Sequence, residues 1–456
     1  MNTYDVVVIG AGPGGYVAAI RAAQLGLKVA CIDKIKQLGG TCLNVGCIPS
    51  KTLLHASELY WKMTHEAGSL GIKTQGCTYS FSEMMERKKK VVKGFNDGVD
   101  ALFKKHKITF IEGSAKLLSP TQVQVAGEAT GAKNIILATG SEPVPLPFLP
   151  FDEKRIVSST GALALTQVPK RLLIVGAGVI GVELGSVYSR LGSEVTFVEF
   201  LDRICPMFDE TISAQLQANL TRQGMKFLLS SKVTGADMTP SEITLRVGEQ
   251  QLKGDVVLVS VGRRPYLQNL GLETVGITPN SKGMIPVNGR FQTSVPNIYA
   301  IGDIIDGPML AHKAFEEAVA AAEIIAGQNP VVNYLAIPNV IYTYPEVASV
   351  GLTETEAKNL GLTVKTGQFP FKVNSRAKCT GEEEGFVKIV SDAATDRILG
   401  IHILGAHASE LISEGAVAIQ NKLTTLQVAH TAHAHPTLSE AIKEAALALH
   451  GRALHR

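Results

Sequence analysis

The sequence predicts an α/β protein in which two doubly wound parallel sheets are followed by a smaller α+β domain. Three observations predict this fold. At roughly 150 residues per domain, a length of 456 residues suggests about three domains. A β-α-β unit with a glycine-rich turn occurs twice in the chain. Beyond Pro338 the pattern changes to alternating strands followed by two helices.

The first β-α-β unit opens the chain. A strand is predicted at Tyr4–Ile9, a glycine turn at Gly10–Gly15 and a helix at Tyr16–Leu25. A second strand at Val29–Ile32 ends at Asp33. This order of strand, glycine turn, helix, strand and carboxylate is typical of a nucleotide-binding βαβ unit.

The second unit repeats the same parts far downstream. They lie at Arg171–Val175, Gly176–Gly181, Val182–Leu191, Val195–Val198 and Glu199. In both units the acidic residue stands 23 positions after the first glycine, from 10 to 33 and from 176 to 199. Equal internal spacing in two βαβ units predicts two dinucleotide-binding (Rossmann-like) domains in one chain.

Each glycine of these turns has a physical task. The first permits the tight turn, the second lets backbone N–H groups approach a pyrophosphate, and the third lets the helix pack on the strand. The phosphates then lie at the positive end of the helix dipole. In chain order these glycines are Gly10, Gly12 and Gly15 in the first unit and Gly176, Gly178 and Gly181 in the second.

The acidic residues indicate which dinucleotides bind. Glu199 is placed to accept hydrogen bonds from both ribose hydroxyls and to repel a 2′-phosphate, which favours NAD over NADP. Arg203, four residues further on, is a basic group that could serve a phosphate. Two such sites in one chain are most simply explained by one bound flavin and one exchanging nicotinamide.

A pair of cysteines follows the first unit directly. Cys42 and Cys47 are separated by four residues, which fits neither the C-x-x-C redox motif nor zinc-finger spacing. An irregular first turn of a helix would bring the sulfurs into bonding range, and the helix N-terminus would lower their thiol pKa values. Two buried, inert cysteines are the alternative. A redox disulfide must touch the flavin ring, so its position assigns FAD to the first domain and NAD to the second.

Composition and charge exclude several classes of protein. A net charge of +3 is too small to indicate a nucleic acid or an anionic membrane as partner. No run of 18 apolar residues predicts a membrane span, and six cysteines are too few for a disulfide-stapled secreted scaffold. The sequence enters a strand without a targeting segment, so we expect a cytoplasmic protein. His430, His433 and His435 have no zinc-type spacing, so we expect no metal site.

Six segments carry a resemblance to a known family. They are GGTCLNVGCIPSK (39–51), the two glycine turns, AIGD (300–303), GPMLAH (307–312) and HAHPTLSE (433–440). Together and in this order they resemble the dihydrolipoyl dehydrogenase family of class I pyridine nucleotide–disulfide oxidoreductases. The CLNVGCIPSK and HPTLSE segments favour this branch over glutathione reductase.

The resemblance implies the roles of the reacting residues. Cys47 is expected to be the thiol in contact with the flavin, and Cys42 the thiol that exchanges with the substrate. His435, oriented by Glu440, is expected to be the general base, supplied across a dimer interface by the other subunit. Lys51 is expected near the edge of the flavin ring.

The resemblance also implies the residues that line the cofactors. For FAD, besides the first glycine turn, these are Asp33, Gly113, Thr139, Gly140, Asp303, Met309, Leu310, Ala311 and His312; for NAD, besides Glu199 and the second turn, they are Val233 and Gly262. Asp33 stands where the family usually has Glu, so its reach toward the ribose is shorter.

The function predicted from this resemblance is reoxidation of protein-bound dihydrolipoamide by NAD+. The expected partners are lipoyl domains or a lipoyl carrier protein of a 2-oxoacid dehydrogenase or glycine-cleavage complex, and a second copy of the chain. The alternatives are an NADPH-dependent disulfide reductase such as glutathione reductase, and a non-catalytic component of a multienzyme complex.

Domain boundaries are predicted from changes in pattern. They give an FAD-binding domain at 1–150, an NAD-binding domain at 151–270, a central domain completing the FAD site at 271–337, and a C-terminal α+β dimerisation domain at 338–456. Pro436 suits the first position of a helix that carries Glu440 about one turn in. The run Arg87–Lys90 is expected to be the solvated face of a helix.

Overall fold

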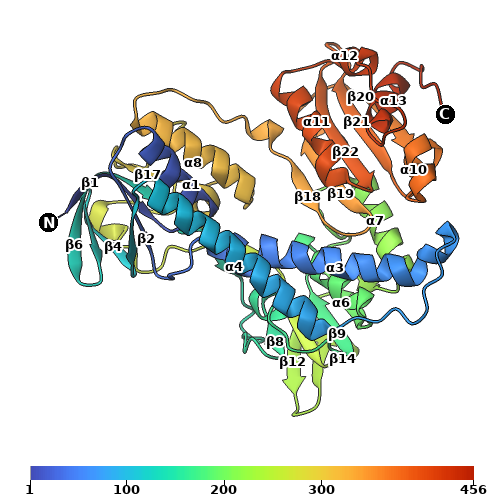
Figure 1. The fold of residues 1–456 in the computed structure, drawn as a ribbon, viewed down its shortest axis with the longest axis horizontal. Helices are drawn as coiled ribbons and strands as arrows, with labels where there is room; N and C mark the ends of the chain where they lie inside the picture. Colours follow the sequence, from blue (N-terminus) through green and yellow to red (C-terminus); the bar gives the residue numbers. More distant parts are fainter. Residues whose placement is uncertain (1, 456) are drawn as a thin grey trace. The chain divides into compact units, whose positions relative to one another are not determined.

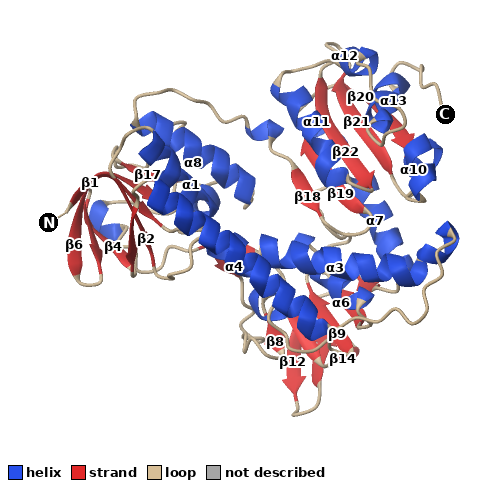
Figure 2. Cartoon of the chain, in the orientation of Figure 1, coloured by secondary structure: helices blue, strands red, loops and turns tan. Residues whose placement is uncertain are grey.

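A computed structural model describes residues 2–455, and the chain divides into two compact units. The first unit comprises Met1–Thr52, Ser82–Val144 and Gly262–Val332; the second comprises Leu53–Phe81, Pro145–Val261 and Asn333–Arg456. Both units mix helices and strands (Figure 2). Within residues 2–455, no helix is both long and apolar enough to cross a membrane.

The first unit is built on a seven-stranded sheet. Its order is β3-β2-β1-β6-β5-β4, and β17 also pairs with β6. The strands are β1 (Thr3–Ile9), β2 (Val29–Asp33), β3 (Thr109–Glu112), β4 (Ala115–Ser119), β5 (Gln122–Val125), β6 (Glu128–Leu137) and β17 (Ile298–Ala300). β1 runs parallel to both β2 and β6, whereas β4, β5 and the start of β6 form an antiparallel meander. Val6, Val7 and Val8 are fully buried, as expected for a central parallel strand covered on both faces.

Helices α1 (Pro13–Gln24) and α8 (Ala311–Ile325) lie side by side in this unit (Figure 1). The segment 271–337, predicted as a central domain, contributes β17 and α8. The other elements of the unit are α2 (Gly40–Val45), the start of α3 (Cys47–His65), most of α4 (Phe81–Lys105), the antiparallel pair β7 (Ser141–Pro143) and β16 (Arg263–Pro265), and the short 3-10 helices η2 (Glu273–Val275) and η3 (Gly302–Ile304).

In the second unit, a five-stranded parallel sheet carries the second glycine turn. Its order is β11-β10-β9-β15-β8, and an antiparallel sheet β12-β13-β14 accompanies it. The strands are β8 (Ile156–Val157), β9 (Arg171–Val175), β10 (Glu194–Val198), β11 (Lys226–Leu228), β12 (Val233–Met238), β13 (Ile243–Val247), β14 (Gln250–Gly254) and β15 (Val256–Val259). The helices are η1 (Ala67–Leu70), α5 (Ser159–Ala162), α6 (Val179–Arg190) and α7 (Glu210–Arg222).

The two helices that follow the glycine turns begin three residues earlier than predicted. α1 begins at Pro13 instead of Tyr16, and α6 begins at Val179 instead of Val182. The N-caps are Gly12 and Gly178, so the last glycines of each turn already belong to the first helical turn. Because glycine lowers helix propensity, the sequence pattern did not predict the first turn of either helix.

The C-terminal part of the second unit is an antiparallel sheet of order β18-β19-β22-β21-β20. Its elements are η4 (Tyr334–Ala336), β18 (Asn339–Ile341), β19 (Glu346–Gly351), α9 (Glu354–Asn359), β20 (Val364–Pro370), η5 (Phe371–Val373), α10 (Ser375–Thr380), β21 (Phe386–Asp392), β22 (Ile398–Gly405), α11 (Ala408–Gln420), α12 (Thr425–His430) and α13 (Glu440–Ala448).

One face of this sheet is apolar and carries two helices (Figure 1). Val350, Ile401 and Ile389 are paired across neighbouring strands and therefore point to the same side. A Cβ on Gly415 of α11 would lie 3.0 Å from Val350, and one on Gly367 would lie 2.3 Å from the carbonyl oxygen of Ala445 in α13. Helices α11 and α13 therefore pack closely on this face.

The opposite face carries polar side chains toward the N-terminus of α7. Lys388 is paired with His402 in register, and its ammonium lies 2.9 Å from Asp209 and 2.9 Å from Glu354. Burial alone would raise the pKa of Asp209, but hydrogen bonds from Thr211 and Lys388 hold it below its usual range. A largely buried cation thus joins the sheet to α7 and α9.

Two expectations about local structure are wrong. Helix α13 begins at Glu440, so Pro436 lies in the preceding turn and Glu440 is the first helical residue. The Thr437 N–H donates to the Glu440 carboxylate at 2.9 Å. This hydrogen bond satisfies a backbone donor just before the helix, so the helix start does not depend on a proline at its first position. Within Arg87–Lys90, Lys88 is buried, because this position turns to the packed side of α4.

Replacing Lys388 with Met should lower the free energy of unfolding by about 3 kcal/mol, because Asp209 then stays buried without its cation. The matched control is Lys358→Met, since Lys358 pairs with Glu354 on the exposed side and should change stability by less than about 1 kcal/mol. Urea unfolding measures both.

The effect of Lys388→Met should also depend on pH in a defined direction. The folded-state pKa of Asp209 is lowered, so its contribution is present above its unfolded pKa of about 3.9 and is lost as pH falls through the folded value. The gap between wild type and variant should therefore narrow in acid; a gap that widened there would contradict the assignment.

Candidate active site

The first glycine turn leaves space at only one of its three predicted positions. A Cβ on Gly10 would lie 2.3 Å from the Ala138 carbonyl oxygen, and one on Gly15 would lie 1.8 Å from the Gly10 carbonyl oxygen. At Gly12 the nearest atom is 3.9 Å away. Gly10 and Gly15 are therefore required because a side chain at either position would overlap the backbone. Gly12 instead faces open space in which a ligand can approach.

The second glycine turn has the same geometry. A Cβ on Gly176 would lie 2.6 Å from the Ser260 carbonyl oxygen, and one on Gly181 would lie 2.3 Å from the Gly176 carbonyl oxygen. Nothing lies within 4 Å of a Cβ on Gly178. A bound pyrophosphate fits the open position of each turn, at the N-terminus of the helix that follows.

The two acidic residues make matching backbone contacts. The Ala11 N–H donates to Asp33 at 2.7 Å, and the Ile35 N–H donates to its other carboxylate oxygen at 2.9 Å. In the second unit Glu199 accepts from Ala177 at 2.6 Å and from Leu201 at 2.8 Å. A carboxylate has about four acceptor positions, so each side chain can still accept from a ribose.

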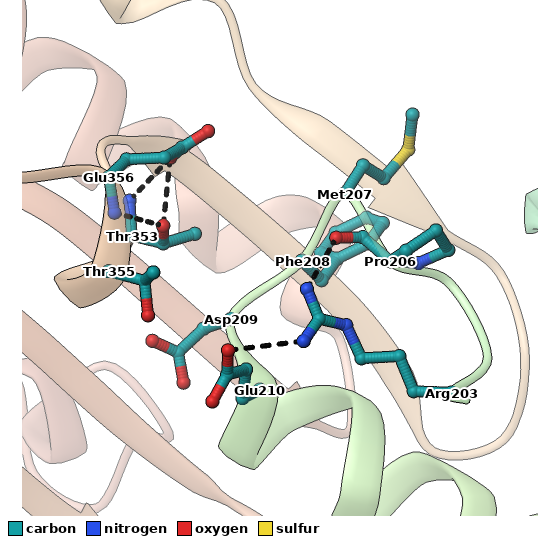
Figure 3. A pocket seen from close by; sticks show the side chains of 9 residues that line it. All are labelled: Arg203, Pro206, Met207, Phe208, Asp209, Glu210, Thr353, Thr355 and Glu356. Atoms are coloured by element: carbon teal, nitrogen blue, oxygen red, sulfur yellow. Dashed lines mark hydrogen bonds and ion pairs between the residues drawn. The ribbon is translucent and has the colours of Figure 1, made fainter. Parts of the chain in front are cut away.

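Arg203 lies in a pocket of the second unit that Figure 3 shows from close by. Its guanidinium donates to Glu210 at 3.1 Å and to the carbonyl oxygen of Pro206 at 3.5 Å. Asp209 and Glu356 also line the pocket, so its charge is mixed. The arginine that could have served a 2′-phosphate is therefore engaged with a carboxylate, which agrees with NAD.

The two predicted redox cysteines are brought together in the first unit. Cys42 lies in α2, Gly46 breaks the helix with φ −140° and ψ −113°, and Cys47 begins α3. The two side chains are hydrogen-bonded to each other. The i, i+5 spacing therefore works because two helices meet at a glycine.

The expectation of a lowered thiol pKa is wrong for Cys42. The hydrogen bond with Cys47, burial and the nearby Cys47 sulfur raise the pKa of Cys42, and the positive charge of Lys51 offsets only part of this. When two sulfurs are adjacent, ionisation of one holds the proton on the other. The cysteine spacing predicted a helix N-terminus near the thiols, but it did not predict that the Cys47 sulfur raises the pKa of Cys42.

Asp303 is held by two residues that the sequence analysis missed. The Ser141 hydroxyl donates to Asp303 at 2.6 Å, and Arg263 donates to the same hydroxyl at 2.8 Å. Burial lowers the pKa of Arg263, whose charge interacts with Asp303 and Cys47. Ser141 and Arg263 follow predicted site glycines, Gly140 and Gly262, and that proximity is the signal that could have found them.

The other predicted FAD residues also lie in the first unit. Thr139 donates to the Tyr266 carbonyl oxygen at 2.6 Å, and the Gly113 N–H donates to the Asp33 carbonyl oxygen at 2.8 Å. Met309 and Leu310 precede α8, which begins with Ala311 and His312. Gly262, predicted for the NAD path, has φ +122° and precedes β16 in this same unit.

The second unit holds the predicted base. His435 Nδ1 lies 3.0 Å from Glu440, and the imidazole is 69% exposed. Burial would raise the pKa of Glu440, but hydrogen bonds from the Thr437 N–H and from His435 lower it. Glu440 is therefore an anion that can fix the histidine tautomer. Val233, predicted for the NAD path, is a buried residue at the start of β12.

Comparison with known proteins defines the class of this molecule. Residues 4–318 match the family described as pyridine nucleotide-disulphide oxidoreductase, and residues 337–446 match the dimerisation domain of that family. The chain therefore belongs to the pyridine nucleotide-disulphide oxidoreductase family. It is an oxidoreductase, and FAD and NAD are its cofactors.

Individual relatives place it more closely. The mitochondrial dihydrolipoyl dehydrogenase of Pisum sativum is 50% identical over 99% of this chain and 92% of the relative. The dihydrolipoyl dehydrogenase of Trypanosoma brucei brucei is 50% identical over 100% of this chain and 98% of the relative. A solved structure of the HOCl-induced flavoprotein disulfide reductase RclA from Escherichia coli has a TM-score of 0.87 at 26% identity, covering 97% of this chain and 99% of that one. The predicted family, fold class and cofactors are confirmed.

Alanine substitutions in the second glycine turn should separate folding from ligand binding. Gly178→Ala meets no atom within 4 Å and has φ −76°, so stability should be unchanged while NADH binding weakens at least about tenfold. Gly181→Ala meets a carbonyl oxygen at 2.3 Å and should lower the free energy of unfolding by about 2 kcal/mol. Thermal unfolding and NADH titration measure the two effects. Unchanged NADH binding in Gly178→Ala would show that no pyrophosphate approaches this turn.

Proposed function

We propose that the chain reoxidises dihydrolipoamide with NAD+, using a Cys42–Cys47 disulfide and FAD. The observation that carries this proposal is the adjacency of the two sulfurs where α2 ends and α3 begins, in the unit that also holds the first glycine turn and Asp303. The names of full-length relatives at 50% identity support the substrate. Adjacent sulfurs beside the positive charge of Lys51 are expected for a redox pair, whereas two inert, buried cysteines would require neither feature.

The substrate half of the reaction is thiol–disulfide exchange. His435 takes a proton from one substrate thiol, and the thiolate attacks Cys42 in the oxidised pair. The disulfide breaks, Cys47 leaves as a thiolate, and a mixed disulfide joins Cys42 to the substrate. The second substrate thiol gives its proton to Cys42 as its sulfur displaces Cys42 from the mixed disulfide. This step releases the cyclic disulfide product and leaves the protein pair reduced by two electrons, with the first proton on His435 and Cys47 as the thiolate.

The cofactor half needs the chain mainly for binding and orientation. When bound, FAD would supply the two-electron transfer between the dithiol and NAD+. The open side of Gly12, the Asp303 carboxylate and the N-terminal turn of α8 would hold FAD. The open side of Gly178 and the Glu199 carboxylate would hold NAD.

The proposal includes the assembly. The match to a dimerisation domain supports a homodimer, in which His435 and Glu440 of one subunit serve the disulfide of the other. Lipoyl domains or a lipoyl carrier protein of a 2-oxoacid dehydrogenase or glycine-cleavage complex would present the substrate. The cytoplasmic location stays a prediction.

The rival function, an NADPH-dependent disulfide reductase, differs at Glu199. This carboxylate is 8% exposed and would lie against a 2′-phosphate. Steady-state rates with NADH and NADPH distinguish the two functions, and a strong preference for NADPH would count against the role of Glu199.

Replacing Cys47 with Ser should abolish lipoamide turnover, because a hydroxyl can neither form the disulfide nor accept the electron pair. FAD should stay bound at one per chain, as measured by flavin absorbance. Cys379→Ser is the matched control, since Cys379 is an exposed cysteine and its removal should leave turnover intact. Full turnover in Cys47→Ser would refute the disulfide role.

Replacing Glu440 with Gln should lower kcat with dihydrolipoamide about a hundredfold, because the His435 imidazole loses the anion that orients it. NADH oxidation by an artificial acceptor that bypasses the thiols should be unaffected. Glu410→Gln, on the exposed side of the first turn of α11, is the control. If the two oxidations fell together, Glu440 would have a structural role only.

A further inference from the structure

A fully buried ion pair lies on α8 in the first unit. The Lys313 ammonium is 3.0 Å from the Glu317 carboxylate, with side-chain exposures of 1% and 0%. Taking two charges out of water costs several kcal/mol for each ion, and their attraction alone often fails to offset this. A buried pair is thus weak evidence for stability, and its other contacts indicate what it does.

Both charged groups contact the same residue, Gly302. Lys313 donates to the Gly302 carbonyl oxygen at 3.0 Å, and the Gly302 N–H donates to Glu317 at 2.7 Å. Gly302 has φ +75°, in the left-handed region that glycine enters freely. The pair therefore fixes both the N–H and the carbonyl group of a residue in a conformation that glycine favours.

The loop after Gly302 also depends on Lys313. A Cβ on Gly307, which has φ +113°, would lie 2.7 Å from Lys313 Cε. The chain from Gly302 to Gly307 thus passes close against the lysine stem. Asp303 lies within this loop, and its carboxylate accepts the Ser141 hydroxyl hydrogen bond from β7. The backbone of Gly302, directly before it, is held from α8, and the Asp303 side chain is held from β7.

We infer that Lys313 and Glu317 are positioning residues for the flavin: they fix the Gly302–Asp303 turn relative to the N-terminus of α8, the helix that carries them. The two places where the first unit would contact the ribityl and phosphate portion of FAD, Asp303 and Met309–His312, then have one fixed separation. This inference rests on the proposed FAD site.

A purely structural role makes a different prediction. Buried ion pairs replaced by apolar residues of similar volume often leave stability unchanged or improve it. A Lys313→Met/Glu317→Leu double variant removes both hydrogen bonds to Gly302 but leaves no unpaired charge. Loss of flavin positioning in a stably folded protein therefore separates the two roles.

The experiment compares this double variant with wild type as holoenzyme and after removal of FAD. We expect the unfolding midpoint of the FAD-free protein to be retained, the dissociation constant for FAD to rise about tenfold or more, as for a lost hydrogen bond to a charged group, and the visible circular dichroism of bound flavin to change. The control is Arg21→Met/Glu323→Leu, which removes a pair between α1 and α8 that does not touch Gly302. Unchanged FAD affinity and dichroism in the Lys313/Glu317 variant would overturn the inference.

Two further variants keep the test decisive. If the double variant does not fold, Glu317→Gln, which retains an acceptor for the Gly302 N–H, should show a smaller rise in the FAD dissociation constant; no rise would overturn the inference. Asp303→Asn tests the proposed FAD site itself. Unchanged FAD affinity in Asp303→Asn would mean that the site is wrongly placed, which is a failure of the proposed function and not of the ion pair.

Discussion

The close approach of a helix to the strand before it is the constraint on which this structure depends. At Gly15 a side chain would overlap the carbonyl oxygen of Gly10, and at Gly181 it would overlap that of Gly176. Only glycine lets α1 and α6 start so near their sheets, and only from there do their N-terminal N–H groups face the open side of the turn. The carboxylates at the ends of β2 and β10 then bind the turn backbone in both units. Nucleotide binding and packing therefore share the same few atoms.

Much of the fold could be predicted because it depends on patterns that are local in sequence. Both βαβ units follow from the spacing of strand, glycines and carboxylate, and the C-terminal strands β18, β21 and β22 follow from alternation, whereas β19 and β20 were not predicted. The predictions that were wrong concern helix starts. The first turns of α1 and α6 were not predicted because they contain glycines, and a helix was predicted to begin at Pro436 although α13 begins at Glu440. Lys88 is buried because helix packing, and not charge, decides which side of α4 faces inward.

The candidate site divides in the same way. Cys42, Cys47, His435 and Glu440 could be found because their residue types are unusual and lie in short motifs. Ser141, Arg263, Lys313 and Glu317 were not predicted, since their hydrogen bonds to Asp303, Ser141 or Gly302 span intervals of 11 to 162 residues. Only Ser141 and Arg263 had a local signal, because they directly follow Gly140 and Gly262. Only Asp303 itself was predicted there. The residues proposed to react could be predicted from the sequence, whereas the residues that hold their surroundings become apparent only in the folded chain.

The two unlike faces of the C-terminal sheet have a consequence for how this part of the chain assembles. Val350, Ile389 and Ile401 point to one side, while Lys388 and His402 point to the other. Slippage of β21 or β22 by one residue would place Lys388 or His402 against the helices α11 and α13 and turn Ile389 or Ile401 toward Asp209. A hairpin in the wrong register would therefore not pack stably on the helices. The alternation of apolar and polar residues thus favours the correct strand register.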